Sequence, residues 1–359
     1  MLRAALPTAF LCLLTASCVQ PTKAGTAPVQ PLVRTAQVGT DADDPAFWVH
    51  PTDPARSLLL ATDKVASPGG ALYVFGLDGL VRQKVGPLDR PNNVDVEYGL
   101  ATPAGPIDIA VVTERFQYRL RVFRVSASGL RPLDGGTGIP VLAGQTGEGR
   151  MPMGIALYRR PADGAIFALV APKTGDTTDY LWQYRLEMDP GTGLVGGTLV
   201  RRFGNFSGTS EVEAVAVDDE LGYVYYADEE YAVRKWRADP DHPDAARELA
   251  VFATDGFHGQ REGIAIVRQS PRSGYVVVSD QIEGGSRLHV FPRQGGAAGP
   301  HDHPRLADIL TSADDTDGID LVSAPLGPDF PAGALAMMNS RERNFLLFDW
   351  RTFAAMLTP

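Results

Sequence analysis

The sequence predicts an all-β protein, a six-bladed β-propeller. Three observations lead to this prediction: one strand pattern recurs six times, a second strand pattern follows each recurrence, and the composition suits a chain with many turns. The 359 residues include 38 Gly and 28 Pro, above the average usage of about 7% and 5%, with no collagen-like period. Many short strands joined by turns have this composition.

The overall composition excludes several classes of protein. A chain of this length with 44% hydrophobic residues can bury a sizeable core, so it is neither a disulfide-stapled miniature nor a disordered tail. Its formal charge of −10 would repel nucleic acids and anionic membrane surfaces at long range. Cations are therefore the partners that the charge favours.

Residues 1–18 have the features of an export segment. Arg3 supplies a basic start, residues 4–14 are apolar, and residues 15–17 are small, as at a cleavage site. The stretch is too short to span a bilayer. Cys18, with Leu14 four positions before it, resembles a bacterial lipobox, although that motif prefers Leu three positions before the Cys, where Thr15 stands. Both lipidation of Cys18 and simple cleavage stay open. We expect an exported protein that is periplasmic, secreted or an outer-membrane lipoprotein.

The segment after the leader reads as a tether. Residues 19–30 are polar and aperiodic, and we assign 19–35 to a linker and 36–359 to the propeller domain. The only other cysteine, Cys12, lies within the leader, so we expect no intramolecular disulfide in the mature chain. We expect that chain to be a monomer.

The recurring pattern is a polar or acidic leading residue followed by alternating small and β-branched residues. The six segments start at Asp44, Asn92, Met153, Glu213, Glu262 and Asp317. Successive starts lie 48, 61, 60, 49 and 55 residues apart, which matches the size of a four-stranded blade. We interpret each segment as the inner strand of a blade.

Two further sets of strands complete each repeat. Apolar runs are predicted to be middle strands; they are residues 58–62, 107–113, 166–171, 223–227 and 275–279. Segments that alternate around an aromatic residue are predicted to be outer strands; they start at Leu72, Arg121, Trp182, Val233, His289 and Phe345. A β-sandwich or two small β domains would also give strands of alternating polar and apolar residues. The recurrence of one motif over nearly the whole chain favours the propeller. Helical periodicity is weak, apart from a possible turn or two within residues 241–248.

The residues that precede the inner strands are candidate metal ligands. In a propeller these positions open onto one face of the central channel, and here most carry side-chain oxygens: Asp43, Asp44, Asn92, Glu213, Glu262, Asp315 and Asp317. Converging carboxylates raise one another's pKa until protons or cations neutralise them. Oxygen ligands without Cys or clustered His favour a hard cation, and calcium accepts such irregular coordination. Taken singly, each acid could equally be a solvated turn residue.

Three basic residues are candidates for substrate binding. Lys64, Arg115 and Lys173 each directly follow a middle strand of the first three blades, so they could surround the same channel mouth, although each alone could be a surface charge. Cations beside a carboxylate ring suit a substrate that carries many phosphates.

Five segments together resemble the β-propeller phytases. They are DADDPAFWVHPTDP, LDRPNNVDVEYG, VEAVAVDDELGYVYYADEE, REGIAI and DDTDGIDLVSAPLGPDFPAG, and the resemblance extends over residues 41–350. It implies a six-bladed propeller with several calcium ions, some structural and some at the channel mouth, where they hold a nucleophilic water and bridge substrate phosphates.

The resemblance also implies roles for single residues. The catalytic calcium carboxylates would be Asp43, Glu213, Glu229, Glu262 and Asp317, with Asp44 adjacent, and the phosphate-binding cations would be Lys64, Arg115 and Lys173. This chain departs from the family where Met153 replaces a Tyr and Gln260 replaces an Asp, and residues 159–165 lack a family lysine. A lost negative ligand could weaken a calcium site.

The predicted activity is calcium-dependent hydrolysis of the phosphomonoesters of myo-inositol hexakisphosphate, as in a 3-phytase, without a covalent intermediate. Two other classes stay open: a propeller lactonase or esterase with a central divalent ion, and a non-enzymatic binding propeller. His301 and His303 are expected in a surface loop rather than at a metal.

Overall fold

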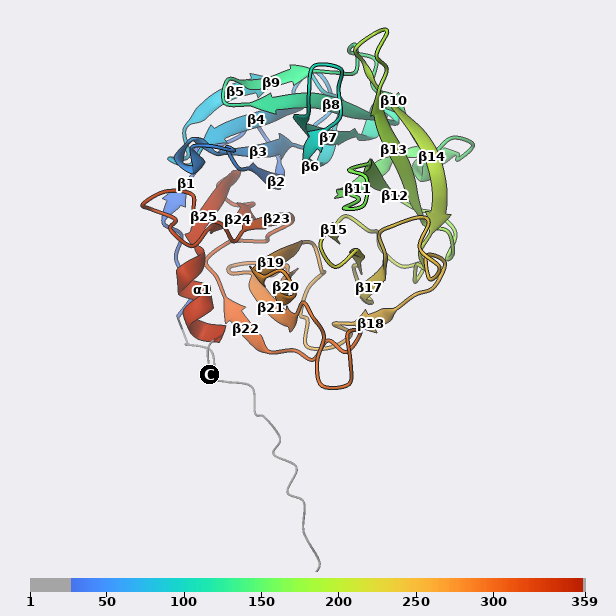
Figure 1. The fold of residues 1–359 in the computed structure, drawn as a ribbon. Coiled ribbons are helices and arrows are strands. Elements are labelled where there is room, and N and C mark those ends of the chain that lie inside the picture. Colours follow the sequence, from blue (N-terminus) through green and yellow to red (C-terminus); the bar gives the residue numbers. More distant parts are fainter. Residues whose placement is uncertain (1–26, 358–359) are drawn as a thin grey trace, which may run out of the picture.

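Six small antiparallel sheets lie around a central axis in the computed structural model, which describes residues 27–357 (Figure 1). The predicted six-bladed β-propeller is confirmed. The leader, Cys18 and residues 19–26 of the predicted linker lie outside the described residues.

The first three blades follow the chain in order. Blade 1 contains β2 (Ala42–Trp48), β3 (Leu58–Asp63), β4 (Ala71–Gly76) and β5 (Val81–Val85). Blade 2 contains β6 (Pro91–Leu100), β7 (Ile107–Glu114), β8 (Arg119–Ser126), β9 (Gly129–Pro132) and β10 (Ile139–Pro140). Blade 3 contains β11 (Pro152–Arg159), β12 (Ile166–Pro172), β13 (Leu181–Met188) and β14 (Val195–Phe203). Short 3-10 turns are present at Pro54–Arg56, Arg115–Gln117 and Gly147–Arg150.

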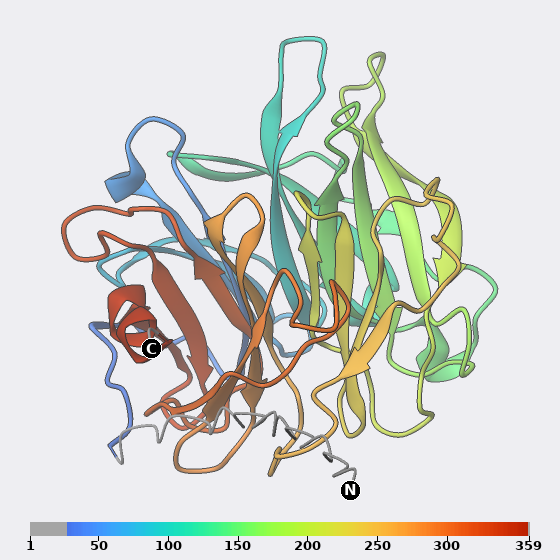
Figure 2. The ribbon, with the colours of Figure 1, turned by 60° about the horizontal axis from the view of Figure 1, so that its bottom comes forward.

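The last three blades end with the closure of the ring. Blade 4 contains β15 (Val215–Asp218), β16 (Tyr223–Asp228), β17 (Ala232–Arg237) and β18 (Ala250–Phe252). Blade 5 contains β19 (Ile264–Ser270), β20 (Ser273–Asp280), β21 (Arg287–Pro292) and β22 (Ala307–Leu310). Blade 6 contains β23 (Ile319–Val322), β24 (Ala334–Asn339), β25 (Asn344–Asp349) and, as its outer strand, β1 (Val33–Arg34). Figure 2 gives a tilted view, in which the loop between β6 and β7 extends from one face.

The hydrophobic core is divided into layers between the blades. Successive side chains of a strand point to opposite faces, so Leu58 and Leu60 of β3 pack against blade 2 while Leu59 and Ala61 pack against blade 6. A middle strand buried on both faces must be apolar at every position. This is why the middle strands read as continuous apolar runs.

The aromatic-containing strands are third strands rather than the outer strands that the sequence predicted. The fourth strand is β5, β9 with β10, β14, β18, β22 or β1. Several of these outer strands are largely exposed; β5, for example, has the sequence VRQKV. A strand that is solvated on its outer edge needs little apolar alternation, so its pattern was too weak to identify.

The ring is closed by residues that the sequence assigned to the linker. Val33 and Arg34 pair with Leu347 and Leu346 of β25, and the Thr35 hydroxyl accepts a hydrogen bond from Phe345 N at 3.0 Å. The propeller therefore starts before residue 36, and the predicted linker boundary is wrong.

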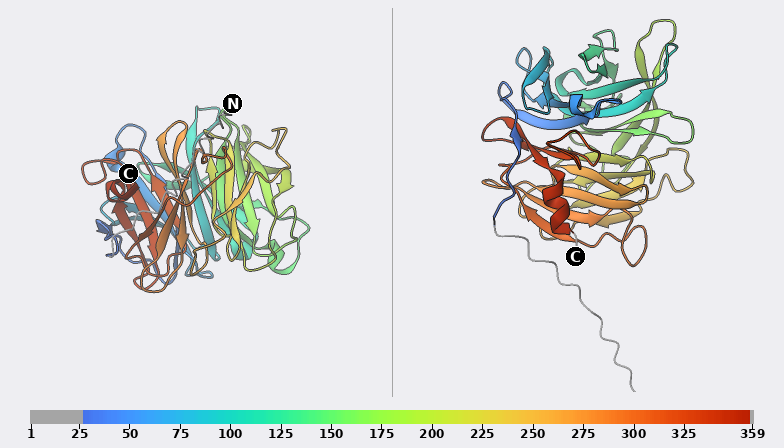
Figure 3. Two further views of the ribbon diagram at one scale, coloured as in Figure 1. Left: turned by 90° about the horizontal axis from the view of Figure 1, so that it is seen from below. Right: turned by 60° about the vertical axis from the view of Figure 1, so that its left-hand side comes forward.

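The C-terminus forms a helix that the sequence did not predict. Helix α1 (Trp350–Leu357) lies alongside blade 6 (Figure 3), with Trp350 and Phe353 buried against Phe348 of β25. The turns within residues 241–248 form no helix. Among the described residues, no helix has the length and apolar character needed to cross a membrane.

Candidate functional site

Antiparallel pairing brings the predicted acidic and basic residues to one end of the channel. The start of each inner strand pairs with the end of the middle strand of its blade: Ala42 pairs with Asp63, Pro91 with Glu114, and Pro152 with Pro172. The residues that follow these ends are Lys64, Arg115 and Lys173. The register therefore positions all three predicted cations at one face, which we call the channel mouth.

Lys64 lies among three carboxylates at the mouth. Its Nζ is 2.5 Å from Asp43 Oδ1, 3.7 Å from Glu213 Oε2 and 3.6 Å from Asp317 Oδ2. Burial alone would lower the pKa of Lys64, but the attraction of Asp43 and Glu213 raises it well above its ordinary value. Asp43 is fully buried, and burial raises its pKa despite the opposing effect of Lys64.

Arg115 and Lys173 meet a carboxylate that the sequence analysis missed. Arg115 Nη2 is 3.5 Å from Glu213 Oε1 and 3.8 Å from Glu211 Oε2. It also contacts the sulfur of Met153. Lys173 Nζ lies 2.8 Å and 3.0 Å from the two Glu211 oxygens. The position of Glu211, two residues before Glu213, was the signal available in the sequence.

Glu229 is held by hydrogen bonds from the loop before β15. Its Oε2 accepts bonds from Ser210 Oγ at 2.6 Å and Glu211 N at 3.3 Å, and Gln260 Nε2 donates to Ser210 Oγ at 2.8 Å. Burial raises the pKa of Glu229 to about 8, with a smaller contribution from Glu213. Gln260, where this chain departs from the family resemblance, therefore acts on Glu229 indirectly, through its hydrogen bond to Ser210.

Glu262 and Asp317 complete the acidic cluster. Burial raises the pKa of Glu262 well above its ordinary value, and the charges of Glu229 and Glu213 add to the effect. Burial likewise raises the pKa of Asp317 to about 7, although Lys64 opposes this. Gln281 Nε2 donates to Asp317 Oδ1 at 2.5 Å, a contact that nothing in the sequence indicated. The five predicted carboxylates thus meet at the mouth.

Two predicted metal ligands lie apart from Lys64. Asp44 points into the channel, where its Oδ2 accepts a hydrogen bond from Val94 N at 2.9 Å. Asp315 has its pKa raised by burial and then by Asp314 and Glu283, which are therefore its acidic neighbours. Neither Asp44 nor Asp315 forms an ion pair with Lys64 in the described chain.

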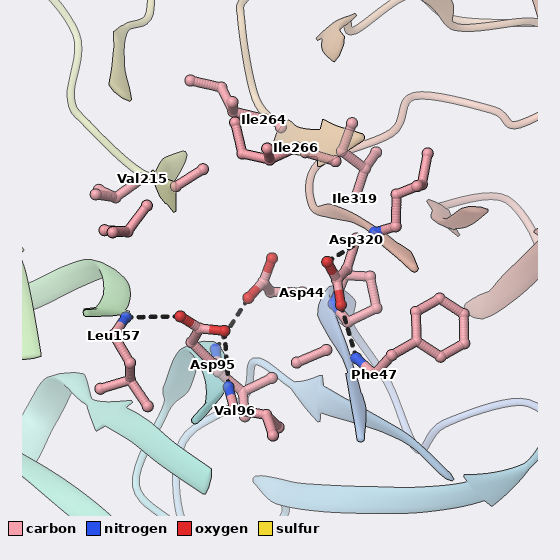
Figure 4. A pocket seen from close by; sticks show the side chains of 18 of the residues that line it. Asp44, Phe47, Asp95, Val96, Leu157, Val215, Ile264, Ile266, Ile319 and Asp320 are labelled. Carbon is pink, nitrogen blue, oxygen red and sulfur yellow. Dashed lines mark hydrogen bonds between the residues drawn. The ribbon is translucent and has the colours of Figure 1, made fainter. Parts of the chain in front are cut away.

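Below the mouth, the channel forms a cavity of about 600 Å³ with further acids along its wall (Figure 4). Two of these acids are bound by a backbone N–H of the neighbouring blade: Asp320 accepts from Phe47 N at 2.7 Å and Asp95 from Leu157 N at 2.6 Å. Burial raises the pKa of Asp95 to about 8 and that of Asp320 to about 6. The sequence analysis did not single out these acids. They lie inside strands, where the ordinary alternation of polar and apolar residues also places polar side chains.

The donor atoms at the mouth suit a hard cation, although the side chains do not enclose one as they stand. Asp43 Oδ2, Glu229 Oε1 and Asn92 Oδ1 are buried oxygens without a hydrogen-bond partner in the described part of the chain, and such oxygens are the ligands that calcium prefers. Within residues 27–357 no group of three His, Cys, Asp or Glu side chains forms a ready metal site. Lys64 takes the central position among the acids instead.

Comparisons with known proteins match almost the whole chain. A sequence model of the Phytase family matches residues 5–345. The 3-phytase of Bacillus subtilis strain 168 is 29% identical over 327 residues, which make up 88% of this chain and 81% of that protein. A crystal structure of BBS1N in complex with ARL6DN aligns at 12% identity and a TM-score of 0.44, over 81% of this chain and 74% of that one. A likeness at that score bears on neither fold nor function.

Proposed function

The chain belongs to the phytase family, and from this premise we propose that it is a calcium-dependent phytase that hydrolyses the phosphomonoesters of myo-inositol hexakisphosphate. The products would be inorganic phosphate and lower inositol phosphates. The observation that carries the proposal is the set of five carboxylates, four of them buried and Asp317 partly buried, gathered around cations at one end of the channel.

The acidic cluster supports a role for a hard cation. Burial raises the pKa of Asp43, Glu229, Glu262 and Asp317, so at neutral pH the cluster retains protons that a bound cation would displace. Calcium held by the five carboxylates would supply Lewis-acid activation of water and charge stabilisation at the phosphoryl group. The Ser210 bond to Glu229 would hold one ligand in a fixed orientation.

The three cations would bind and orient the substrate. Lys64, Arg115 and Lys173 already interact with carboxylates at the mouth, and a hard cation on those carboxylates would free the basic side chains for phosphate oxygens. Two phosphates of one ring held together would orient the ester that is cleaved.

The test is release of inorganic phosphate from calcium phytate by the mature chain, with and without a chelator. We expect activity that disappears on chelation and returns with calcium but not with magnesium. Activity that survives thorough chelation would contradict the metal mechanism. Lactone hydrolysis without phosphate release would favour a propeller lactonase or esterase, and no turnover of either substrate would favour a binding propeller.

We also propose that the mature protein is exported, with the leader removed before or at Cys18. Mass spectrometry of the N-terminus from the native host distinguishes a diacylglyceryl-modified Cys18 from an unmodified cleaved end. Retention of residues 1–17 would contradict export by this leader.

A further inference from the structure

A cluster of basic and aromatic side chains lies at the end of blade 4 away from the channel mouth. Arg237 ends β17 and pairs with Tyr223 at the start of β16, whereas the other end of β16 leads to Glu229 at the mouth. Lys235 pairs with Tyr225 two positions along, so these four side chains lie on one face of the sheet. That face packs against blade 5, the neighbouring blade in Figure 1.

Three side chains that can carry positive charge surround the ring of Tyr223. Lys235 Nζ lies 3.8 Å from the ring centre and the guanidinium carbon of Arg237 lies 4.7 Å from it. His301 makes a T-shaped contact with the same ring, with 5.7 Å between the ring centres. His301 belongs to the loop that follows β21, and this loop also leaves its blade at the end away from the mouth.

The ammonium group of Lys235 is occupied by contacts within the protein. It donates to Pro300 O at 2.7 Å and to His303 Nε2 at 3.1 Å, and the Nδ1 of His303 donates in turn to a backbone carbonyl at 2.8 Å. Burial lowers the pKa of Lys235 to about 7, against the opposing charge of Asp218 and with a further contribution from Arg237. Lys235 therefore adds charge to the cluster but offers a ligand no free donor.

Arg237 and His301, in contrast, have polar atoms without partners. Arg237 forms no ion pair within residues 27–357, and its Nε is buried without a hydrogen-bond partner. The Nδ1 of His301 is also buried and unpartnered in this part of the chain. Buried polar groups nearly always bind protein, water or a ligand. Both residues are partly exposed, so a ligand can approach them from solvent.

The acids nearest to the cluster are already paired with other cations. Asp218 accepts two hydrogen bonds from Arg293, at 2.5 Å and 2.6 Å, and Asp244 lies 3.3 Å from Arg247 Nη2. These pairings leave the guanidinium group of Arg237 without a carboxylate of its own.

The surroundings of His301 are accordingly electropositive. Burial lowers the pKa of His301, and the charges of Lys235, Arg237 and Arg247 lower it further, with Asp244 opposing them. A bound anion would compensate these charges and would favour the protonated imidazole.

We propose that Arg237 and His301 form an anion-binding site at the end of blade 4 away from the mouth, and that its ligand is a phosphate group. The guanidinium fork can bind two oxygens while it stacks on Tyr223, and the imidazole can donate to a third oxygen. A carboxylate has only two oxygens, so the donor set suits phosphate better. Inorganic phosphate and a phosphate ester share this chemistry, and the site does not depend on the proposed function.

The test is titration calorimetry of the mature chain with inorganic phosphate, after metal has been removed by dialysis against a chelator. We expect saturable binding whose Kd rises about tenfold in Arg237→Gln, as for the loss of one charge-assisted hydrogen bond. His301→Gln should raise the Kd less, by about threefold, because a neutral donor is lost.

Arg56 and Lys64 provide the controls. Arg56 is an exposed arginine just before β3, at the same end of the propeller as Arg237, so Arg56→Gln removes an equal charge and should leave the Kd unchanged. Equal weakening by Arg56→Gln would mean a general effect of charge and would overturn the site. Phosphate binding that Lys64→Ala abolishes and Arg237→Gln preserves would belong to the mouth and would also overturn it.

Proton NMR of the histidine rings supplies a second measurement. Phosphate should raise the pKa of His301, whose resonance is identified by its loss in His301→Gln, and the rise should be absent in Arg237→Gln. A His301 titration that phosphate does not change would contradict a ligand at this position, whatever the substitutions do to stability.

Phytate titrated in the same metal-free buffer distinguishes the two sources of the ligand, because removal of calcium stops the proposed hydrolysis. Tighter Arg237-dependent binding of phytate would support the site and identify an ester as its ligand. Equal Arg237-dependent binding would support a site for a single phosphate group. A wild type that shows no Arg237-dependent binding of either anion, yet releases phosphate from phytate when calcium is restored, would overturn this site and leave the proposed function intact.

Discussion

In the proposed function, the acidic residues at the mouth hold a cation and the basic residues hold phosphate, and the two groups predict different kinetic effects. Glu213 contacts both Lys64 and Arg115, so it joins the acidic cluster to the basic one. Loss of its charge should disturb both groups, whereas loss of Lys64 removes a single phosphate ligand.

We expect Glu213→Gln to lower kcat for phytate by at least about 100-fold at any substrate concentration, comparable to the loss of a group that stabilises transition-state charge. Lys64→Ala should act mainly through KM, and more on phytate than on a monoester. Steady-state kinetics at saturating calcium measure both effects, and the exposed Glu187→Gln on β13 is a control for loss of a surface charge. Near wild-type kinetics for both mouth variants would mean that catalysis takes place elsewhere.

The channel acid Asp95 predicts a pH dependence of stability. Its carboxyl group releases its proton at a pKa of about 8 in the folded chain, against 3.8 as its ordinary value. Between these pH values the folded state binds more protons than the unfolded chain, so this contribution to stability is present in full below pH 3.8 and is lost as pH rises through about 8. Each pKa unit corresponds to about 1.4 kcal/mol.

Asp95→Asn should remove this dependence, because the amide cannot acquire a buried charge. It keeps one acceptor oxygen for either Leu157 N or Val96 N, which bond to different oxygens of Asp95, and loses the other hydrogen bond at every pH. In chelator, we expect the variant to melt at a higher temperature than wild type at pH 8.5, with the difference shrinking toward pH 4. Thermal denaturation across this range measures it. A difference that is constant with pH would show that Asp95 does not titrate in this interval.

At the scale of elements, ring closure depends on a two-residue strand near the N-terminus. β1 supplies the outer strand of blade 6, and Thr35 binds both Phe345 N and, through its backbone carbonyl, the Asn344 side chain. These contacts join residues more than 300 positions apart, so their loss leaves blade 6 without the strand that joins it to the N-terminal part of the chain.

We expect a chain that starts at Ala36 to melt at least about 5 °C below one that starts at Ala27, since a loss of a few kcal/mol shifts the midpoint of a large domain by several degrees. Both chains lack the leader and most of the tether, so the difference isolates β1 and its flanking residues. Differential scanning calorimetry in excess calcium measures the shift. Equal midpoints would mean that closure does not require β1.

At the scale of the whole molecule, carboxylates from different blades face one another across the mouth and the channel. Their mutual repulsion disfavours the closed ring, and a cation bound only by the folded state stabilises it by mass action. The stability of the fold, like the activity, should therefore depend on calcium.

We expect the melting temperature to rise steeply with calcium, with each site contributing about 2.7 kcal/mol at a concentration 100 times its Kd. Magnesium at equal ionic strength should have a smaller effect, because it demands a regular octahedral site. A calcium-free protein as stable as the loaded one would show that the acidic cluster is not a site for several ions.

What the sequence by itself determined is the part of the protein that depends on local pattern. The six inner strands, the middle strands and the residues next to them were predictable because burial on alternating faces repeats at short range. Asp43, Glu213, Glu262 and Asp317 were identified by their place in that repeat, and Glu229 by the resemblance to phytases.

What only the tertiary structure decided depends on which residues meet across blades. The pairing of β1 with β25 and the place of Lys64 among three acids both follow from closing a ring of six sheets. The residues that make such contacts are distant in the chain, so no local sequence pattern indicates them. The outer strands and α1 were missed for a different reason. They face solvent on one side, where many residue types are acceptable, so their sequences show no clear pattern.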